Sequence, residues 1–157
     1  MKKLIIIRHS KSSWKDHSLS DFDRPLNKRG IKDGEKMSKF LKKYISSVDL
    51  LISSSSERTR LTTSYFQREI QFKDLLFTKK LYHASSQEII KELQEINIQV
   101  KSVLLVGHNP GLTEFINKKT DINILNSPTT GIVIIKYRIK SWLELDHQTG
   151  KVDLIKI

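Results

Sequence analysis

The stretch LIIIRHS, Leu4–Ser10, changes within one position from a run of four apolar residues to the polar pair Arg8 and His9. A short apolar run without polar alternation is typical of a strand that is covered on both faces, as in a parallel sheet. Four further runs share this pattern: Val48–Ile52, Leu75–Phe77, Val103–Val106 and Ile132–Tyr137. We therefore predict five buried strands, the first of which ends in a charged pair.

Segments with helical spacing lie between these runs, and each is preceded by residues that suit a helix start: Asn27, Ser54 with Glu57, Ser85 with Glu88, and Asn109 with Pro110. Strands that alternate with helices indicate an open α/β sheet. The tail SWLELDHQTGKVDLIKI, residues 141–157, holds two strand-like runs around His147–Gly150 and predicts a C-terminal β-hairpin.

Length and composition indicate one domain over residues 1–157, because the chain contains no linker, repeat or low-complexity tract. No apolar run approaches the roughly 20 residues that span a bilayer, and the four apolar residues after MKK are too few for a signal peptide. We therefore expect a cytoplasmic protein with no membrane partner. The absence of cysteine excludes disulfides and thiolate catalysis.

The net charge of +11 comes from 28 basic and 17 acidic residues. Such a charge can indicate an anionic partner, such as nucleic acid or a phosphorylated substrate. Most of the basic residues are lysines scattered along the predicted helices, and they form no tract with interleaved aromatic residues. We therefore interpret the charge mainly as a lysine-rich composition and expect no nucleic-acid partner.

Two histidines and two arginines are expected at one edge of the sheet. Arg8 and His9 end the first strand, and Arg58 follows the serine-rich turn after the second. His108 comes directly after the fourth strand. Ligands of open α/β sheets bind outside the carboxyl ends of the strands, so these distant residues are predicted to form one site.

This combination of side chains favours phosphoryl transfer over metal binding. Two histidines without a neighbouring carboxylate make a poor metal site, and arginines would repel a cation. Planar guanidinium groups match the oxygens of a phosphoryl group, and a neutral imidazole can attack phosphorus and carry that group. A second imidazole can donate a hydrogen bond to the same oxygens.

Six segments together resemble the histidine phosphatase superfamily, and more narrowly its short branch related to bacterial phosphohistidine phosphatases. In chain order they are LIIIRHSKSSW, DFDRPLNKRG, LISSSSERTRLT, LYHAS, VLLVGHNPGL and SPTTGIVIIKY. The resemblance covers residues 2–137. It implies a phosphoglycerate mutase-like, three-layer α/β/α sandwich with a mostly parallel central sheet, and neither a metal nor an organic cofactor.

The resemblance also implies roles for individual residues. His9 matches the nucleophile that becomes phosphorylated, Arg8 and Arg58 match the arginines that hold the phosphate, and His108 matches the histidine that completes the pocket. Three further residues match substrate-binding positions: Arg24, Lys11 and Asn109. For Arg24 a structural role, holding its loop to the sheet, stays open as the alternative.

The chain departs from the superfamily pattern where many members place a Glu or Asp general acid, after the third strand. LYHASSQE offers no such acid there, since Glu88 suits a helix cap and His83 is interpreted as structural. Phosphate esters need a proton for their alkoxide leaving group, whereas phosphohistidine can release imidazole. The sequence thus favours a phosphatase acting on phosphohistidine in a protein. The alternatives are a phosphatase for small phosphate esters and a non-catalytic module that binds phosphate or nucleic acid.

Overall fold

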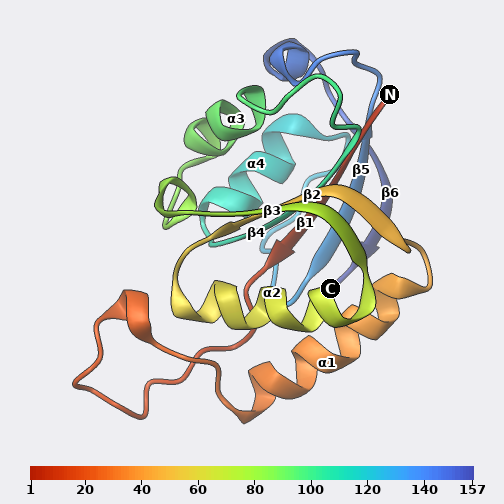
Figure 1. Ribbon diagram of the computed structural model, residues 1–157. Helices are drawn as coiled ribbons and strands as arrows, with labels where there is room; N and C mark the ends of the chain where they lie inside the picture. Colours follow the sequence, from red (N-terminus) through yellow and green to blue (C-terminus); the bar gives the residue numbers. More distant parts are fainter.

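A six-stranded sheet forms the centre of the computed structural model, which describes residues 1–157 (Figure 1). The strands are β1 (Lys2–Arg8), β2 (Ser47–Ser54), β3 (Gln71–Thr78), β4 (Ser102–Gly107), β5 (Ile132–Tyr137) and β6 (Lys151–Lys156). Their order across the sheet is β3-β2-β4-β1-β5-β6. The first four strands pair in parallel, while β5 and β6 pair antiparallel, so the sheet is mostly parallel as predicted. All five predicted strands are present.

Helices cover both faces of this sheet (Figure 1). They are α1 (Lys28–Lys42), α2 (Glu57–Glu69), α3 (Ser86–Gln94) and α4 (Gly111–Lys119), with 3-10 turns η1 (Asp21–Asp23), η2 (Lys79–Leu81) and η3 (Trp142–His147). The alternation of side chains along β1 produces two cores, one on each face of the sheet, because successive strand side chains point to opposite faces. Ile5 and Ile7 pack in the core that holds α1 and α2, whereas Leu4 and Ile6 pack in the core of α3 and α4. The three-layer α/β/α prediction is thus confirmed.

Two of the four predicted helix starts are confirmed. The side-chain oxygen of Asn27 accepts a hydrogen bond from the Gly30 amide at 2.8 Å, and that of Ser85 accepts one from the Glu88 amide at 3.1 Å. The predicted cap at Ser54 is wrong, because pairing between β2 and β3 continues through this residue and α2 is preceded by Ser56.

The fourth predicted helix start is displaced by one residue. Pro110 occupies the cap position of α4, and Asn109 lies just before it. The Asn109 side-chain oxygen still accepts hydrogen bonds from the amide and hydroxyl of Thr113, so it helps to close the first turn.

The predicted C-terminal hairpin is wrong. Its first run is the 3-10 turn η3, which begins with a capping box between Ser141 and Glu144 and buries Trp142 and Leu145 three positions apart. Its second run is β6, which pairs antiparallel with β5 and so forms the edge of the main sheet. Burial at a spacing of three residues suits a tight helix rather than a strand.

The carboxyl ends of the central strands meet at one edge of the sheet. Arg8 at the end of β1 lies in register with Gly107 at the end of β4, and β2 ends close by at Ser54. The long loop between β1 and α1 extends beyond this edge (Figure 1). None of the helices is both long and apolar enough to cross a bilayer.

Candidate active site

A cavity of about 300 Å³ opens at this edge of the sheet. Its lining residues are Arg8, His9, Lys11, Ser12, Trp14, Asp21, Arg24, Arg58, His83, His108, Asn109 and Thr129. All seven residues that the sequence predicts as site residues are among them. The structure therefore brings together side chains that are separated by up to 101 positions in the chain.

His9 is held as a neutral imidazole with one nitrogen free. Its Nδ1 lies 2.7 Å from the carbonyl oxygen of Ser10, and because a carbonyl can only accept, Nδ1 carries the hydrogen. Burial lowers the pKa of His9 to about 3, and the positive charges of Arg58 and Arg8 add to this effect against the Ser10 hydrogen bond. The lone pair is then on Nε2 at neutral pH, which is the state a nucleophile requires.

His108 lies beside His9, with 5.2 Å between the ring centroids. Burial, together with the neighbouring His9 and Arg58, lowers its pKa to about 2, so this ring is also neutral. Its Nε2 lies 2.8 Å from the hydroxyl of Ser54. When that hydroxyl donates to Nε2, the single ring hydrogen is on Nδ1, and Nδ1 is buried without a hydrogen-bond partner.

Two arginines also line the cavity. Arg8 donates from Nη1 to the Ser127 carbonyl at 3.1 Å, and Arg58 donates from both terminal nitrogens to Asp21. The Nε atoms of both arginines are buried and have no partner, as is Nδ1 of His108. Buried polar groups in proteins are almost always paired, so three such nitrogens in residues that line one cavity are unusual. The guanidinium groups of Arg8 and Arg58 suit an anion with several oxygens.

Asp21 is a cavity residue that the sequence analysis missed. Its Oδ1 accepts from Arg24 at 3.0 Å, and its Oδ2 accepts from Arg58 at 3.0 Å, from His83 at 2.9 Å and from the Tyr82 hydroxyl. Partial burial raises the pKa of this carboxyl, but hydrogen bonds from Tyr82, His83, Arg24 and Arg58 outweigh it and hold the pKa well below its usual range. The spacing of Asp21 and Arg24 in DFDR is the one sequence signal that could have pointed to it.

The three residues predicted to bind substrate take different positions. Arg24 donates to Ser12, Ser13 and Asp21, and its guanidinium carbon lies 3.5 Å from the centroid of the Trp14 ring. These contacts attach the loop to the site, which is the structural alternative that the sequence left open for Arg24.

Asn109 and Lys11 lie at the cavity mouth. The Asn109 side-chain amide donates to Asn126 and to the Ser127 carbonyl. It thus holds the segment whose Ser127 carbonyl also accepts a hydrogen bond from Arg8. Lys11 is exposed and lines the cavity from the loop after β1.

His83 also lines the cavity, although the sequence analysis interpreted it as structural. Its φ of 50° places it in the left-handed region, which a non-glycine residue rarely adopts. Its ring lies 5.0 Å from that of His108, and half of its side chain is exposed. A strained backbone at a cavity wall is a common feature of functional sites, so His83 joins the candidate residues.

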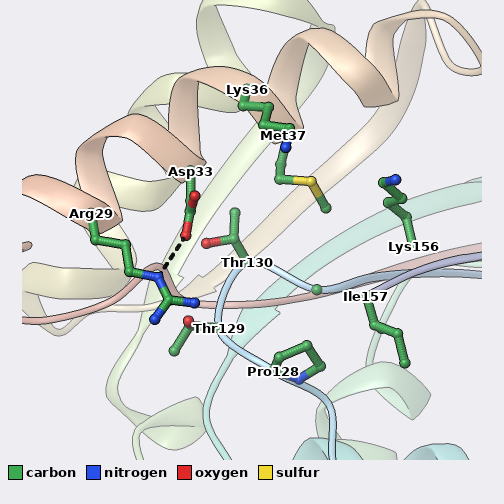
Figure 2. Close-up of a pocket in the computed structure, with 10 residues that line it drawn as sticks. Arg29, Asp33, Lys36, Met37, Pro128, Thr129, Thr130, Lys156 and Ile157 are labelled. Atoms are coloured by element: carbon green, nitrogen blue, oxygen red, sulfur yellow. Dashed lines mark ion pairs between the residues drawn. The ribbon is translucent and has the colours of Figure 1, made fainter.

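A separate cavity of about 230 Å³ is lined in part by the Thr129–Thr130 turn (Figure 2). Figure 2 shows Arg29 and Lys36 approaching it from α1, with Lys156 near the C-terminal end. It shares Thr129 with the first cavity and contains none of the predicted site residues. No group of three or more His, Cys, Asp or Glu side chains is placed to hold a metal ion.

Comparisons with known proteins identify the family of this chain. The model of the histidine phosphatase superfamily (branch 1) matches residues 4–101. An uncharacterised chloroplastic protein of Arabidopsis thaliana is 31% identical over 123 residues, which is 72% of this chain and 56% of that protein. An uncharacterised protein of Mycobacterium tuberculosis is 30% identical over 104 residues, or 66% of this chain and 63% of that one. The chain thus spans less than two thirds of the length of these relatives.

Solved structures agree in fold over the whole chain. A protein from Agrobacterium tumefaciens named as a phosphohistidine phosphatase, SixA, superposes with a TM-score of 0.81 at 25% identity, covering 99% of this chain and 97% of that one. The protein histidine phosphatase SixA complexed with tungstate superposes with a TM-score of 0.80 at 18% identity, covering 98% and 95%. The matched model, which covers more than half of the sequence, shows that this chain belongs to the histidine phosphatase superfamily.

Proposed function

We propose that this protein is a phosphatase that uses His9 as its nucleophile and removes phosphate from phosphohistidine in a protein. One observation carries the proposal. A neutral imidazole, His9, with its Nδ1 on the Ser10 carbonyl and its Nε2 free, lies in a cavity that Arg8, Arg58 and His108 also line. The names of the similar SixA structures support the same activity.

The reaction would proceed in two displacements. The Nε2 lone pair of His9 attacks phosphorus, the bond from phosphorus to the substrate imidazole breaks, and that imidazole takes a proton from solvent. Water then attacks the phosphorus of phospho-His9, the bond to Nε2 breaks, and the water releases a proton as inorganic phosphate forms. Arg8, Arg58 and His108 would stabilise the phosphoryl oxygens throughout.

Asp21 bears on the choice of substrate. Because its pKa is held well below the usual range, it stays ionised and cannot protonate a leaving group. An imidazole leaving group makes a smaller demand for such a proton than an alkoxide. The cavity therefore suits a phosphoramidate better than an alkyl phosphate.

A phosphatase for small phosphate esters is the second candidate. One observation favours it: the half-exposed imidazole of His83 lies in the cavity wall, where a leaving-group oxygen could contact it. A marked preference for alkyl over phosphohistidine substrates would support this candidate and contradict the first.

The decisive experiment compares phosphate release from a phosphohistidine protein by the wild type and by His9→Ala, without added metal. We expect a loss of roughly 10⁴-fold in kcat/KM and the disappearance of an acid-labile, alkali-stable phosphoenzyme. His147→Ala, which removes an exposed histidine outside the cavity, is the matched control. Full turnover by folded His9→Ala would overturn the mechanism. A wild type without phosphatase activity would favour a non-catalytic binding module.

A further inference from the structure

A second depression of about 610 Å³ lies along the loop after β1 and the first turn of α1. Its lining residues are Lys11, Ser12, Ser13, Trp14, Lys15, Leu26, Asn27, Lys28, Arg29 and Ile31. Lys11, Ser12 and Trp14 line both this depression and the catalytic cavity, so the two adjoin each other. We call the depression the basic groove.

The charges of the basic groove are all of one sign. Four of its ten lining residues are cationic and none is acidic. At its far end Arg29 also lines the cavity of Figure 2, to which Lys36 and Lys156 add further positive charge. Asp33 pairs with Arg29 at 3.5 Å there, but the Arg29 side chain stays 73% exposed, so this pair neutralises the groove only weakly.

The groove also presents apolar surface that is free to be covered. Trp14 is 66% exposed, and Ile31 on α1 is 42% exposed. The Trp14 ring is held on one face by the Arg24 guanidinium, so its position is fixed although it is exposed. Large aromatic side chains that are fixed and exposed are common anchors at protein interfaces.

We propose that the basic groove binds the polypeptide that flanks the phosphohistidine of the substrate, and that this flank is acidic. This inference rests on the proposed function, because a phosphohistidine held in the catalytic cavity must continue its chain through an open side. The basic groove adjoins the catalytic cavity and so lies on that route. Its four cationic lining residues, with no acidic one among them, favour carboxylate side chains. Trp14 packs against an apolar side chain of the same segment.

A nucleic acid would fit the charge but not the rest of the surface. Single-stranded nucleic acids are bound by several aromatic side chains that stack successive bases. Trp14 is the single aromatic residue that lines the groove. The groove is therefore better suited to a peptide with carboxylates than to a phosphate backbone with bases.

The test uses phosphohistidine peptides with identical centres and flanks rich in Asp and Glu, in Ala and Ser, or in Lys. We expect the wild type to hydrolyse the acidic peptide with about tenfold higher kcat/KM than the lysine peptide, mainly through KM. In K15E/K28E this preference should disappear. Neither residue lines the catalytic cavity, so hydrolysis of a small aryl phosphate should stay unchanged.

The matched control is K39E/K91E, which makes the same change of net charge at two exposed lysines outside the groove. It should keep the preference for acidic flanks, and high salt should weaken that preference in the wild type. The groove proposal is overturned if the wild type does not discriminate between flanks, or if both double variants lose the preference equally. A separate result would contradict the proposed function: hydrolysis of the peptides by His9→Ala at the wild-type rate.

Discussion

The inner and outer walls of the cavity satisfy their hydrogen bonds in opposite ways. The inner wall consists of Arg8, His9 and His108, and two of these residues keep a buried donor nitrogen without a partner. The outer wall consists of Asp21, Arg24 and His83, and the Asp21 carboxylate accepts from Arg24, from His83 and from the Tyr82 hydroxyl. The inner wall thus carries the charge of Arg8 without a carboxylate beside it, whereas the outer wall is held together by the Asp21 carboxylate.

Arg58 belongs to both walls. Its terminal nitrogens donate to the carbonyl and carboxylate of Asp21, while its Nε faces no partner, and only 2% of the residue is exposed. Asp21 thereby fixes the orientation of a guanidinium group that is also expected to bind phosphate. Such positioning of a charged donor before the substrate arrives is a main source of catalytic power.

The largest effect that the comparison predicts is at Arg58. Arg58→Lys should lower kcat/KM by about 10³-fold, because an ammonium group cannot replace a fixed planar fork at a phosphoryl group. Arg24→Lys, which alters an arginine that binds mainly protein groups, should cost about tenfold or less. Steady-state kinetics together with thermal unfolding measure both effects. If the two variants lose activity equally, the distinction between the walls does not hold.

The second prediction concerns the pH dependence of stability. In the unfolded chain His9 and His108 take up protons below about pH 6.5. In the folded chain both stay neutral down to about pH 3, because burial lowers their pKa values. The free energy of unfolding should therefore fall between pH 6.5 and pH 4, by roughly 1.4 kcal/mol per pH unit for each histidine at most. Asp21 contributes in a different window, since its lowered pKa stabilises the fold above about pH 4 and is lost below it.

Denaturant titrations across this pH range provide the measurement. His9→Asn/His108→Asn should flatten the slope between pH 6.5 and pH 4. The matched control, His17→Asn/His147→Asn, alters two exposed histidines and should leave the slope as it is. An unchanged slope in the first double variant would show that the inner histidines are not held neutral.

The smallest expected effect is at Asp21. Asp21→Asn removes the negative charge that competes for Arg24 and Arg58, so inorganic phosphate should inhibit the variant about tenfold more strongly. Thermal stability should fall, because two buried guanidinium groups lose their charged partner. The inhibition constant for phosphate measures the first effect. Asp23→Asn, on the same turn but bonded only to Ser20, should change neither value.

The sequence predicted the sheet and the residues at its edge because both depend on local signals. Continuous apolar runs gave the five strands, and the charged pair after LIII pointed to the strand end. The failures came where a neighbour in space decides the outcome. Pairing with β3 extends β2 through Ser54, and burial of Trp142 and Leu145 makes a 3-10 turn from a run that reads as a strand.

The amino-acid order alone indicates which side chains are available for chemistry: two imidazoles and two guanidinium groups that follow strand-forming runs, in an order that resembles one superfamily. Their chemical states follow from the folded arrangement. Burial makes His9 and His108 neutral, the Ser10 carbonyl leaves Nε2 of His9 free, and Asp21 binds the outer arginine and histidine. These states depend on desolvation and on contacts between residues distant in the chain, and no local pattern encodes either of them.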